Sequence, residues 1–480
     1  MRRETPRASM LCMAGLLAGC SLAPPYKVPE SAPVPAAYQE PSARQPAQPM
    51  DTRPRGEWWQ VFHDPQLDAL EAKAGDANQN IKAAFARLLQ ARAETRIARA
   101  DLFPSLTGAA SAQRARVSPN SPTYLPGKPT MGSDFNVEAD LSYEVDLWGR
   151  VRNQVASAKA NQQASAADLA SLDLSIRAEL ASDYFDIRGD DLQLLLLDQA
   201  VSDYEHSLRL TRNLYVGGAA PLGDVAQAET QLENARTRAA DMRLQRARLQ
   251  HAIALLIGEN PSSYSLTANP LPPELAPPSV DPGVPSALIE RRPDVAEAER
   301  RVASANAQIG VARAAYFPQF TLSADAGFNS VHSYNWLSAP SRFWSVGPQL
   351  SVPLFEGGRL LAQTDRARAL YLEQVASYRN TVLTAFQDVE DSLVALRQLA
   401  QEADSAGRAV TAAQISLQQA QYRYSAGAVT YLEVSSAETT ALQAQLSAVS
   451  IEARRMDAAV LLIKALGGGW QAASGAPVRS

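Results

Sequence analysis

Residues 134–146 read Asp-Phe-Asn-Val-Glu-Ala-Asp-Leu-Ser-Tyr-Glu-Val-Asp, so apolar and polar side chains alternate over the whole stretch. This period of two is typical of a β-strand with one apolar and one polar face. The same alternation recurs at 320–329 and 344–354, and more weakly at 105–116. Each stretch has roughly ten residues, the length that a tilted strand needs to cross a bilayer. We therefore expect four transmembrane strands; the alternative is a half-buried sheet on a soluble domain.

The expected strands belong to an internal repeat. Residues 98–107 recur as 312–321 at an offset of 214, and Leu141-Ser142 with Gly149-Arg150 recur as Leu350-Ser351 with Gly358-Arg359 at an offset of 209. The offset therefore drops by five residues between Thr107 and Leu141. This interval of the first copy is rich in proline, so we expect a longer loop there than in the second copy. The two copies, residues 65–260 and 286–466, are separated by a Pro-rich connector at 261–285 and followed by a tail at 467–480. Each copy predicts a helix, two strands and a very long helical hairpin.

Two runs without proline, between Pro129 and Pro221 and from residue 354 to residue 476, predict the long helices. Apolar residues step by three or four in each run, which is typical of a coiled-coil stripe. A helix from 150 to 215 would be about 100 Å long at 1.5 Å per residue. A shorter helix is expected to begin at Pro65 and to end before Pro104. The stripes are formed by Leu169, Leu172, Ile176, Leu180, Tyr184 and Ile187, and by Leu383, Phe386, Leu393 and Leu396.

Four strands cannot close a barrel, and open strand edges are not tolerated in lipid. Two chains would give eight strands with an interior filled by side chains, whereas three give twelve strands and an aqueous hole. We therefore expect a mainly α-helical chain whose four transmembrane β-strands join a trimeric 12-stranded outer-membrane β-barrel, continued by a long α-helical barrel. The acids of the first alternating stretch predict a cation-preferring lumen, with a merely solvated face as the alternative. They are Asp134, Glu138, Asp140, Glu144 and Asp146.

The N-terminus reads as an export signal. Arginines precede a short apolar stretch and then Leu17-Ala18-Gly19-Cys20, which fits a bacterial lipobox. We expect residues 1–19 to be the signal peptide, Cys20 to be lipidated, and residues 20–64, rich in Pro, to be an extended tether. Ser21, not Asp, after the cysteine favours outer-membrane sorting. The alternative is an ordinary signal with an accidental cysteine.

Composition argues against other classes of protein. With 45 Lys+Arg against 50 Asp+Glu, the chain has no basic excess for nucleic acid. Its two cysteines both fall in the first twenty residues, and its four His show no metal-binding spacing. No phosphate-binding loop and no nucleophile elbow is present. We expect no catalytic site, no metal and no cofactor.

Together these motifs resemble the TolC-like outer membrane factors, in particular the lipoprotein branch of NodT-type RND efflux outer membrane proteins. The resemblance covers essentially the whole mature chain. It implies a homotrimeric duct with a periplasmic helical tunnel that engages outer membrane lipid, a periplasmic adaptor (membrane fusion protein) and an inner-membrane transporter of the RND type. The motifs that carry it are Pro24-Pro25-Tyr26 after the lipobox, Trp58-Trp59-Gln-Val-Phe62 with Asp64-Pro65, Asp146-Leu-Trp-Gly-Arg150, Arg291-Arg292-Pro293-Asp294-Val295 with Ala298-Glu299, and Phe355-Glu-Gly-Gly358.

The resemblance also implies that each helical hairpin turns at the periplasmic tip in a Tyr, Gly, acid pattern. The matching residues are Tyr215, Gly218 and Asp224 in the first copy, and Tyr424, Gly427 and Glu433 in the second. The acids either face the closing pore or occupy the first turn of a helix, where they favour the dipole. Both readings stay open for Asp224, whereas for Glu433 we favour a gate role.

Val429 and Ser436 stand where the enterobacterial type protein has charged gate residues, which suggests a weaker or differently placed network. We expect a hydrogen bond between Tyr424 and Asp224 to favour the closed state.

Two other functions are compatible with parts of this pattern. A duct for type I protein secretion shares the expected fold, although the lipobox and the Arg291–Val295 segment favour small-molecule efflux. A lipid-anchored periplasmic adaptor also has a helical hairpin, but the hairpin here occurs twice and the β-domains that flank it in adaptors are missing.

Overall fold

A computed structural model describes residues 21–31, 38–39, 56–122, 124–127, 129–272, 275–278, 280 and 291–469. The expected signal peptide, Cys20, most of the tether and part of the connector lie outside these residues. The described residues form two compact units. The first comprises the described residues within Met1–Glu30, Arg87–Ser165 and Glu297–Tyr378, and the second those within Ser31–Ala86, Ala166–Ala296 and Arg379–Ser480.

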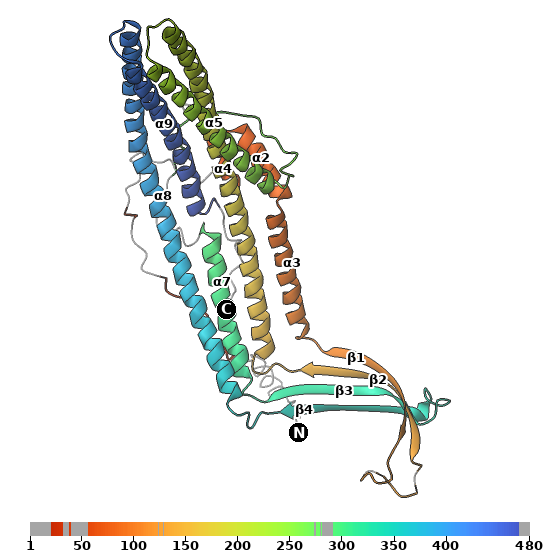
Figure 1. Cartoon of the computed structure of the whole chain (residues 1–480). Helices are drawn as coiled ribbons and strands as arrows, with labels where there is room; N and C mark the ends of the chain where they lie inside the picture. Colours follow the sequence, from red (N-terminus) through yellow and green to blue (C-terminus); the bar gives the residue numbers. More distant parts are fainter. Residues whose placement is uncertain are drawn as a thin grey trace. The chain divides into compact units, whose positions relative to one another are not determined.

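The first unit contains a four-stranded antiparallel sheet in the order β1-β2-β3-β4 (Figure 1). Its strands are β1 (Ser105–Arg116), β2 (Met131–Glu144), β3 (Gln319–Ser330) and β4 (Arg342–Ser351). A short 3₁₀ turn, η2 (Ala339–Ser341), precedes β4. The four strands predicted from alternation are confirmed.

The register of the sheet sorts its side chains by polarity, because residues directly opposite each other share a face. Asp140 on β2 lies opposite Thr107 on β1 and Asp325 on β3, which in turn lies opposite Ser345 on β4. Following these pairs along the middle of the strands places the polar residues on one face and the apolar residues on the other, while Arg114, Arg342 and Phe343 near the strand ends depart from the pattern. The apolar face includes Leu106, Ala110, Phe135, Val137, Leu141, Phe320, Leu322, Phe328, Trp344, Val346 and Leu350.

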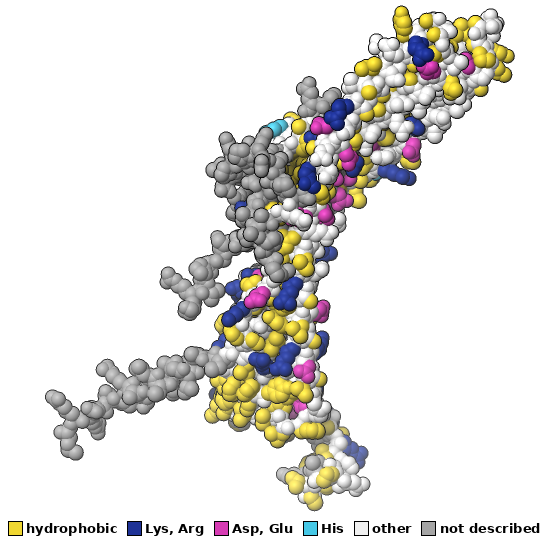
Figure 2. Space-filling model, turned by 90° about the vertical axis from the view of Figure 1, so that its left-hand side faces the viewer, with side chains coloured by type: hydrophobic (Ala, Val, Ile, Leu, Met, Phe, Trp, Pro, Cys, Tyr) yellow, Lys and Arg dark blue, Asp and Glu magenta, His cyan; other side chains and the backbone are white. Residues whose placement is uncertain are grey.

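Large apolar side chains on this face are exposed in the single chain. Leu106 is 71% exposed, Trp344 75% and Leu350 65%. Figure 2 shows hydrophobic side chains gathered over the part of the molecule that carries the strands. An apolar sheet face of this size requires an apolar environment or a partner.

The helices reproduce the internal repeat with equal lengths. α3 (Gln79–Ala100) and α7 (Pro293–Ala314) have 22 residues each, and α4 (Arg150–Val216) and α8 (Arg359–Ser425) have 67 each. α5 (Leu222–Leu256) and α9 (Tyr431–Ala465) have 35 each. The long helical hairpins predicted from the Pro-free runs are confirmed. None of the helices in the described part of the chain is both long and apolar enough to span a membrane.

The segment after Asp64 differs from the single helix expected there. It forms α2 (Pro65–Ala77) and α3, which are separated at Asn78 and preceded by the 3₁₀ turn η1 (Trp58–Phe62). The Asn78 Oδ1 accepts hydrogen bonds from the backbone N–H groups of Asn80 and Ile81, while its Nδ2 donates to the Leu256 carbonyl. Asn78 therefore caps the second helix and attaches the break to α5.

The core of the second unit contains much of the stripe predicted on α4. Leu180, Tyr184 and Ile187 are fully buried and Ile176 is 4% exposed. They pack with residues of η1, α2, α5 and α9. On α8 the stripe is confirmed in part: Leu393 is buried and Leu396 packs against the core, whereas Leu383 is 52% exposed beside the buried Val382.

Candidate functional site

The two helical turns have the same backbone structure. At the end of α4, the N–H of Gly218 donates to the Tyr215 carbonyl at 2.9 Å, and that of Ala219 donates to Leu214 at 2.8 Å. At the end of α8, Gly427 donates to Tyr424 and Ala428 to Arg423, both at 2.9 Å. This pair of bonds is a Schellman motif, which requires a left-handed residue.

The φ angles of 75° at Gly218 and 71° at Gly427 provide that conformation. The repeated glycines of the tip pattern are therefore explained by helix termination.

The two acids of the tip pattern both lie in the first turn of the helix that follows the turn. Glu433 also forms an ion pair across its turn, with Oε1 2.5 Å from the Arg423 Nη1. Its side chain is 44% exposed and that of Arg423 is 54% exposed. Both acids therefore lie where the helix-dipole alternative places them, while the gate role favoured for Glu433 stays a prediction. The ion pair of Glu433 with Arg423 was not predicted from the sequence.

The tyrosines of the two tips differ in their surroundings. The Tyr424 ring lies 5.8 Å from the Tyr431 ring in an edge-to-face arrangement, whereas Tyr215 is 44% exposed. Burial raises the pKa of Tyr424, the Asp224 carboxylate raises it further, and a hydrogen bond with Thr211 lowers it. Among the contacts between described residues, no hydrogen bond joins Tyr424 to Asp224 within one chain, so the expected bond stays a prediction.

The five acids predicted for the lumen fall into two groups. Asp134, Glu138 and Asp140 lie on the polar face of β2, where Asp134 accepts a hydrogen bond from the Asn329 Nδ2 at 2.8 Å. Asp325, which shares this face opposite Asp140, was part of the alternating pattern but was not predicted as a lumen acid.

Glu144, the last residue of β2, and Asp146, which follows it, are instead paired with arginines of the first turn of α4. The Arg150 guanidinium donates to both Glu144 oxygens, at 2.8 and 2.6 Å. Asp146 accepts hydrogen bonds from the Arg152 backbone N–H at 2.8 Å and from its Nε at 3.2 Å. These two carboxylates are charge-paired with arginine side chains, so they contribute less negative potential than Asp134, Glu138 and Asp140.

A group of acids on α4 was not predicted. Burial raises the pKa of Asp183 to about 7, and Glu179, Asp186 and Asp457 raise it in the same direction. Burial followed by Asp457 raises the pKa of Asp186 to about 6. Asp457 comes from α9 and accepts a hydrogen bond from the Ser182 hydroxyl at 2.5 Å. Within the residues that the structure covers, no group of three or more His, Cys, Asp or Glu has an arrangement that could hold a metal ion.

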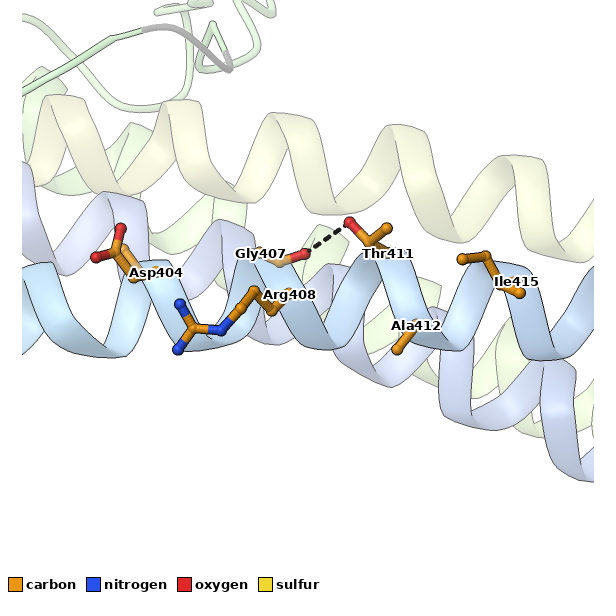
Figure 3. Close-up of a pocket in the computed structure, with 7 residues that line it drawn as sticks. Asp404, Gly407, Arg408, Thr411, Ala412 and Ile415 are labelled. Atoms are coloured by element: carbon orange, nitrogen blue, oxygen red, sulfur yellow. Dashed lines mark hydrogen bonds between the residues drawn. The ribbon is translucent and has the colours of Figure 1, made fainter.

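A hollow lies along α8 in the second unit. Figure 3 shows that its labelled residues all come from this helix, with the Thr411 hydroxyl donating to the Gly407 carbonyl at 3.0 Å. Because a single helix supplies the lining, the hollow is an open groove and not an enclosed small-molecule site. The labelled residues are Asp404, Gly407, Arg408, Thr411, Ala412 and Ile415.

A sheet with one apolar and one polar face, joined to long paired helices with capped turns, is the architecture of a membrane channel subunit. Comparison with known proteins identifies the family. The chain belongs to the outer membrane efflux protein family, which it matches over residues 72–259 and 284–468. The two matched segments correspond to the two copies of the repeat, so the chain contains two repeats of this family.

Relatives and solved structures support the same assignment. The toluene efflux pump outer membrane protein TtgC of Pseudomonas putida is 33% identical over 470 residues, covering 97% of this chain and 96% of that protein. The probable outer membrane lipoprotein SilC of Salmonella typhimurium is 30% identical, covering 95% and 97% of the two chains. The solved structure of the outer-membrane channel OprN has a TM-score of 0.83 and 31% identity over 94% of this chain and 100% of that one. The chain is therefore a TolC-like outer membrane channel of an efflux pump, and it is not an enzyme.

Proposed function

We propose that the chain works as a homotrimer, anchored in the outer membrane through a lipid on Cys20, and forms the passive exit duct of a tripartite efflux system. A periplasmic adaptor and an inner-membrane transporter of the RND type supply the cargo and the energy. Residues 1–19 serve as the signal peptide and residues 20–64 as the tether.

The sheet is the observation that carries the proposal. Within the part of the chain that the structure describes, β1 pairs only with β2 and β4 only with β3, so this sheet has two free strand edges. Unpaired backbone groups cost several kcal/mol each in hydrocarbon, so the edges require partners. Three copies bring together twelve strands around a polar face wide enough to hold water, whereas eight strands would be filled by side chains.

The lipid anchor and the pump partners have separate support. The Leu17-Ala18-Gly19-Cys20 stretch fits a lipobox, and SilC, a relative over most of both chains, is described as a probable lipoprotein. Relatives such as TtgC are described as parts of efflux pumps, so a pump is the natural partner of this chain as well. The capped turns at Gly218 and Gly427 form the end of the duct that would meet an adaptor.

The test is a deletion strain complemented with the full chain or with an empty vector. The proposal predicts that deletion raises sensitivity to at least one class of compound in a panel of drugs, metal ions, organic acids and solvents, and that the full chain restores resistance. A Cys20→Ser variant should restore less resistance because it loses the anchor. A deletion that leaves the whole panel unchanged while abolishing export of a protein would favour the type I secretion duct instead.

A further inference from the structure

The charged side chains of the sheet are divided between its two faces. All five acids within the four strands lie on the polar face, whereas all three arginines lie on the apolar face. Arg114 and Arg116 share the side of β1 that holds Leu106, because residues two apart on a strand point the same way. Arg342 on β4 lies opposite Phe328. Since a charged side chain is costly at the middle of a bilayer and tolerated near its surface, the level of these arginines on the sheet decides their role.

All three arginines lie at the end of the sheet that carries the hairpin connections, here called the far end. Arg116 is the last residue of β1 and Arg342 is the first of β4. The opposite end of each strand leads to a helix, α3, α4, α7 or α8, so the connections 117–130 and 331–341 lie at the far end (Figure 1). The proposed function places the helices in the periplasm, and the far end then lies at the outer leaflet of the outer membrane.

The far end has no carboxylate on the apolar face to neutralise these arginines. The sequence has no Asp or Glu in residues 111–133 or in residues 326–355. Asp134, next in the sequence, lies on the polar face and accepts a hydrogen bond from Asn329 there. All three arginine residues are exposed. The far end therefore presents uncompensated positive charge, although the whole chain has a net charge of -5.

Arginines at the opposite end of the strands are paired within the chain. Three arginines near the starts of α4 and α8 each form an ion pair with a nearby acid: Arg150 with Glu144, Arg152 with Asp146, and Arg359 with Glu356. Among the described residues, no such pair involves Arg114, Arg116 or Arg342. This contrast indicates that the arginines of the far end take their counter-charge from outside the protein.

Aromatic side chains lie beside the arginines on the same face. Trp344 on β4 lies two residues closer to the helices than Arg342, and Phe135 on β2 lies two residues closer than the residue opposite Arg114. Trp336, from the connection before β4, packs on Phe135 with ring centroids 5.9 Å apart. Because aromatic residues are enriched where lipid headgroups meet hydrocarbon, this band indicates that the arginines lie at headgroup level.

We propose that Arg114, Arg116 and Arg342 form a binding site for the phosphate groups of an acylated glycolipid in the outer leaflet, of the lipopolysaccharide class. A guanidinium group donates two parallel hydrogen bonds to a phosphate and keeps its charge at any physiological pH. The apolar face and its aromatic band adjoin the arginines, so the acyl chains and the phosphates of one molecule both have a surface to contact. A free phosphate ion would use only the arginines, which favours an amphiphile as the ligand.

The arginines are distributed over the two edge strands of the sheet, β1 and β4. In the proposed twelve-stranded wall the edges of neighbouring copies adjoin, so Arg342 of one copy approaches Arg114 and Arg116 of the next. Three such sites would surround the trimer at headgroup level. This arrangement rests on the proposed function, and a single chain would hold only a part of each site.

Titration of the purified full chain with lipid in detergent tests the site. The probes are diphosphorylated lipid A, the same lipid A with its phosphates removed, and inorganic phosphate; native mass spectrometry counts the lipid bound to each trimer. The unsubstituted trimer should bind diphosphorylated lipid A more tightly than phosphate-free lipid A, and inorganic phosphate at the same concentration should not displace it. A basic residue near a charged lipid surface contributes about fivefold in affinity, so Arg114→Gln/Arg116→Gln/Arg342→Gln should weaken binding on the order of 100-fold.

A matched control removes three exposed arginines from the same unit but away from the sheet. Arg359→Gln/Arg366→Gln/Arg368→Gln changes the net charge by the same amount and should bind lipid A as the unsubstituted protein does. If the triple variant of the site does not form trimers, Arg342→Gln and Arg114→Gln/Arg116→Gln carry the test. They should weaken binding about fivefold and about 25-fold.

The outcomes separate this inference from the proposed function. Equal binding of lipid A by the two triple variants, or equal binding of lipid A with and without its phosphates, would overturn the lipid site although the trimer stands. Displacement by inorganic phosphate at equal concentration would indicate a free-phosphate site and would also overturn it. If the unsubstituted chain forms no trimer, the proposed function fails and the shared site fails with it.

The stability of the trimer provides a second measurement. Diphosphorylated lipid A should raise the temperature at which the unsubstituted trimer dissociates in detergent, because a ligand that binds the assembled site stabilises the assembly. The variant that lacks the three site arginines should show little of this rise, whereas the control with substitutions on α8 should show all of it. A rise of the same size in the site variant would contradict a role for the arginines.

Discussion

Arg423 at the end of α8 and Glu433 at the start of α9 form an ion pair across the second helical turn, with Nη1 and Oε1 2.5 Å apart. Both side chains are about half exposed, so the pair adds little to folding stability, on the order of 1 kcal/mol or less. In the proposed trimer, however, three copies of this pair would surround the end of the duct. Charge placed at a constriction affects ion passage far more than it affects folding.

The first prediction concerns this ion pair. Glu433→Gln should change single-channel conductance in planar bilayers while leaving the unfolding midpoint within a few degrees of the unsubstituted protein. Glu229→Gln provides a matched control, because Glu229 pairs with Arg212 on the first hairpin at 3.5 Å with similar exposure. Equal conductance for both variants would argue against a gate role for Glu433.

The second prediction concerns Tyr424 and Asp224. The Asp224 carboxylate is near enough to raise the pKa of Tyr424, so rearrangement of the tip in the closed trimer could bring the two groups into a hydrogen bond. If that bond favours the closed state, Tyr424→Phe and Asp224→Ala should both raise conductance. Tyr215→Phe removes the hydroxyl of the more exposed counterpart and should have no effect. Unchanged conductance in both test variants would count against the bond.

The third prediction concerns the acids on α4. Their pKa values are raised in the folded protein, to about 7 for Asp183 and about 6 for Asp186, mainly through burial. The folded chain therefore binds more protons than the unfolded chain between about pH 4 and pH 7, and stability should fall as the pH rises through this window. Asp190, on the same helix, also has a raised pKa, about 7. Burial is the largest cause, Asp186 and Asp191 raise the pKa further, and Arg246 lowers it.

Asp183→Asn should raise the thermal midpoint at pH 8 and flatten its dependence on pH, because the amide cannot ionise. Asp241→Asn replaces an exposed acid on α5 and should leave the slope unchanged. Thermal unfolding in detergent from pH 5 to pH 8 provides the measurement. A midpoint that rises with pH in the unsubstituted protein would contradict the assigned direction.

The fourth prediction concerns ion selectivity. Asp140 and Asp325 lie opposite each other on the polar face, whereas Asp146 is held by Arg152. Reversal potentials in a tenfold salt gradient should show cation preference, which Asp140→Asn/Asp325→Asn should reduce more than Asp146→Asn does. The reverse order would indicate that the strand acids do not face the conducting path.

Much of the fold could be predicted from local sequence patterns. Alternation over 134–146 indicates β2, and the Pro-free run after Pro129 indicates α4, because both signals depend only on neighbouring residues. The break at Asn78 was missed because it depends on a side chain that caps α3 and bonds to Leu256, far away in the sequence. Leu383 fits the apolar stripe of α8 but is exposed, because the packing partners of the helix decide which of its residues are buried.

The site was predictable in position but less so in contacts. The glycines at the two helical turns could be predicted from the repeated Tyr, Gly, acid pattern, and their positive φ angles explain why glycine occurs there. The partners of charged residues were not predictable: Glu144 is bound by Arg150, six residues away, and Asp183 is influenced by Asp457 from another helix. Ion pairs and acid clusters depend on which helices pack together, which no periodicity reports.

The sharpest test of the trimeric duct is the mass of the full, lipid-bearing chain in detergent. We expect particles of three chains, because three copies of the four-stranded sheet give a twelve-stranded wall with a water-filled interior. Particles of one chain would leave both strand edges open, and particles of two would leave no aqueous path. Either result, obtained with a protein that still confers efflux, would contradict the trimeric duct.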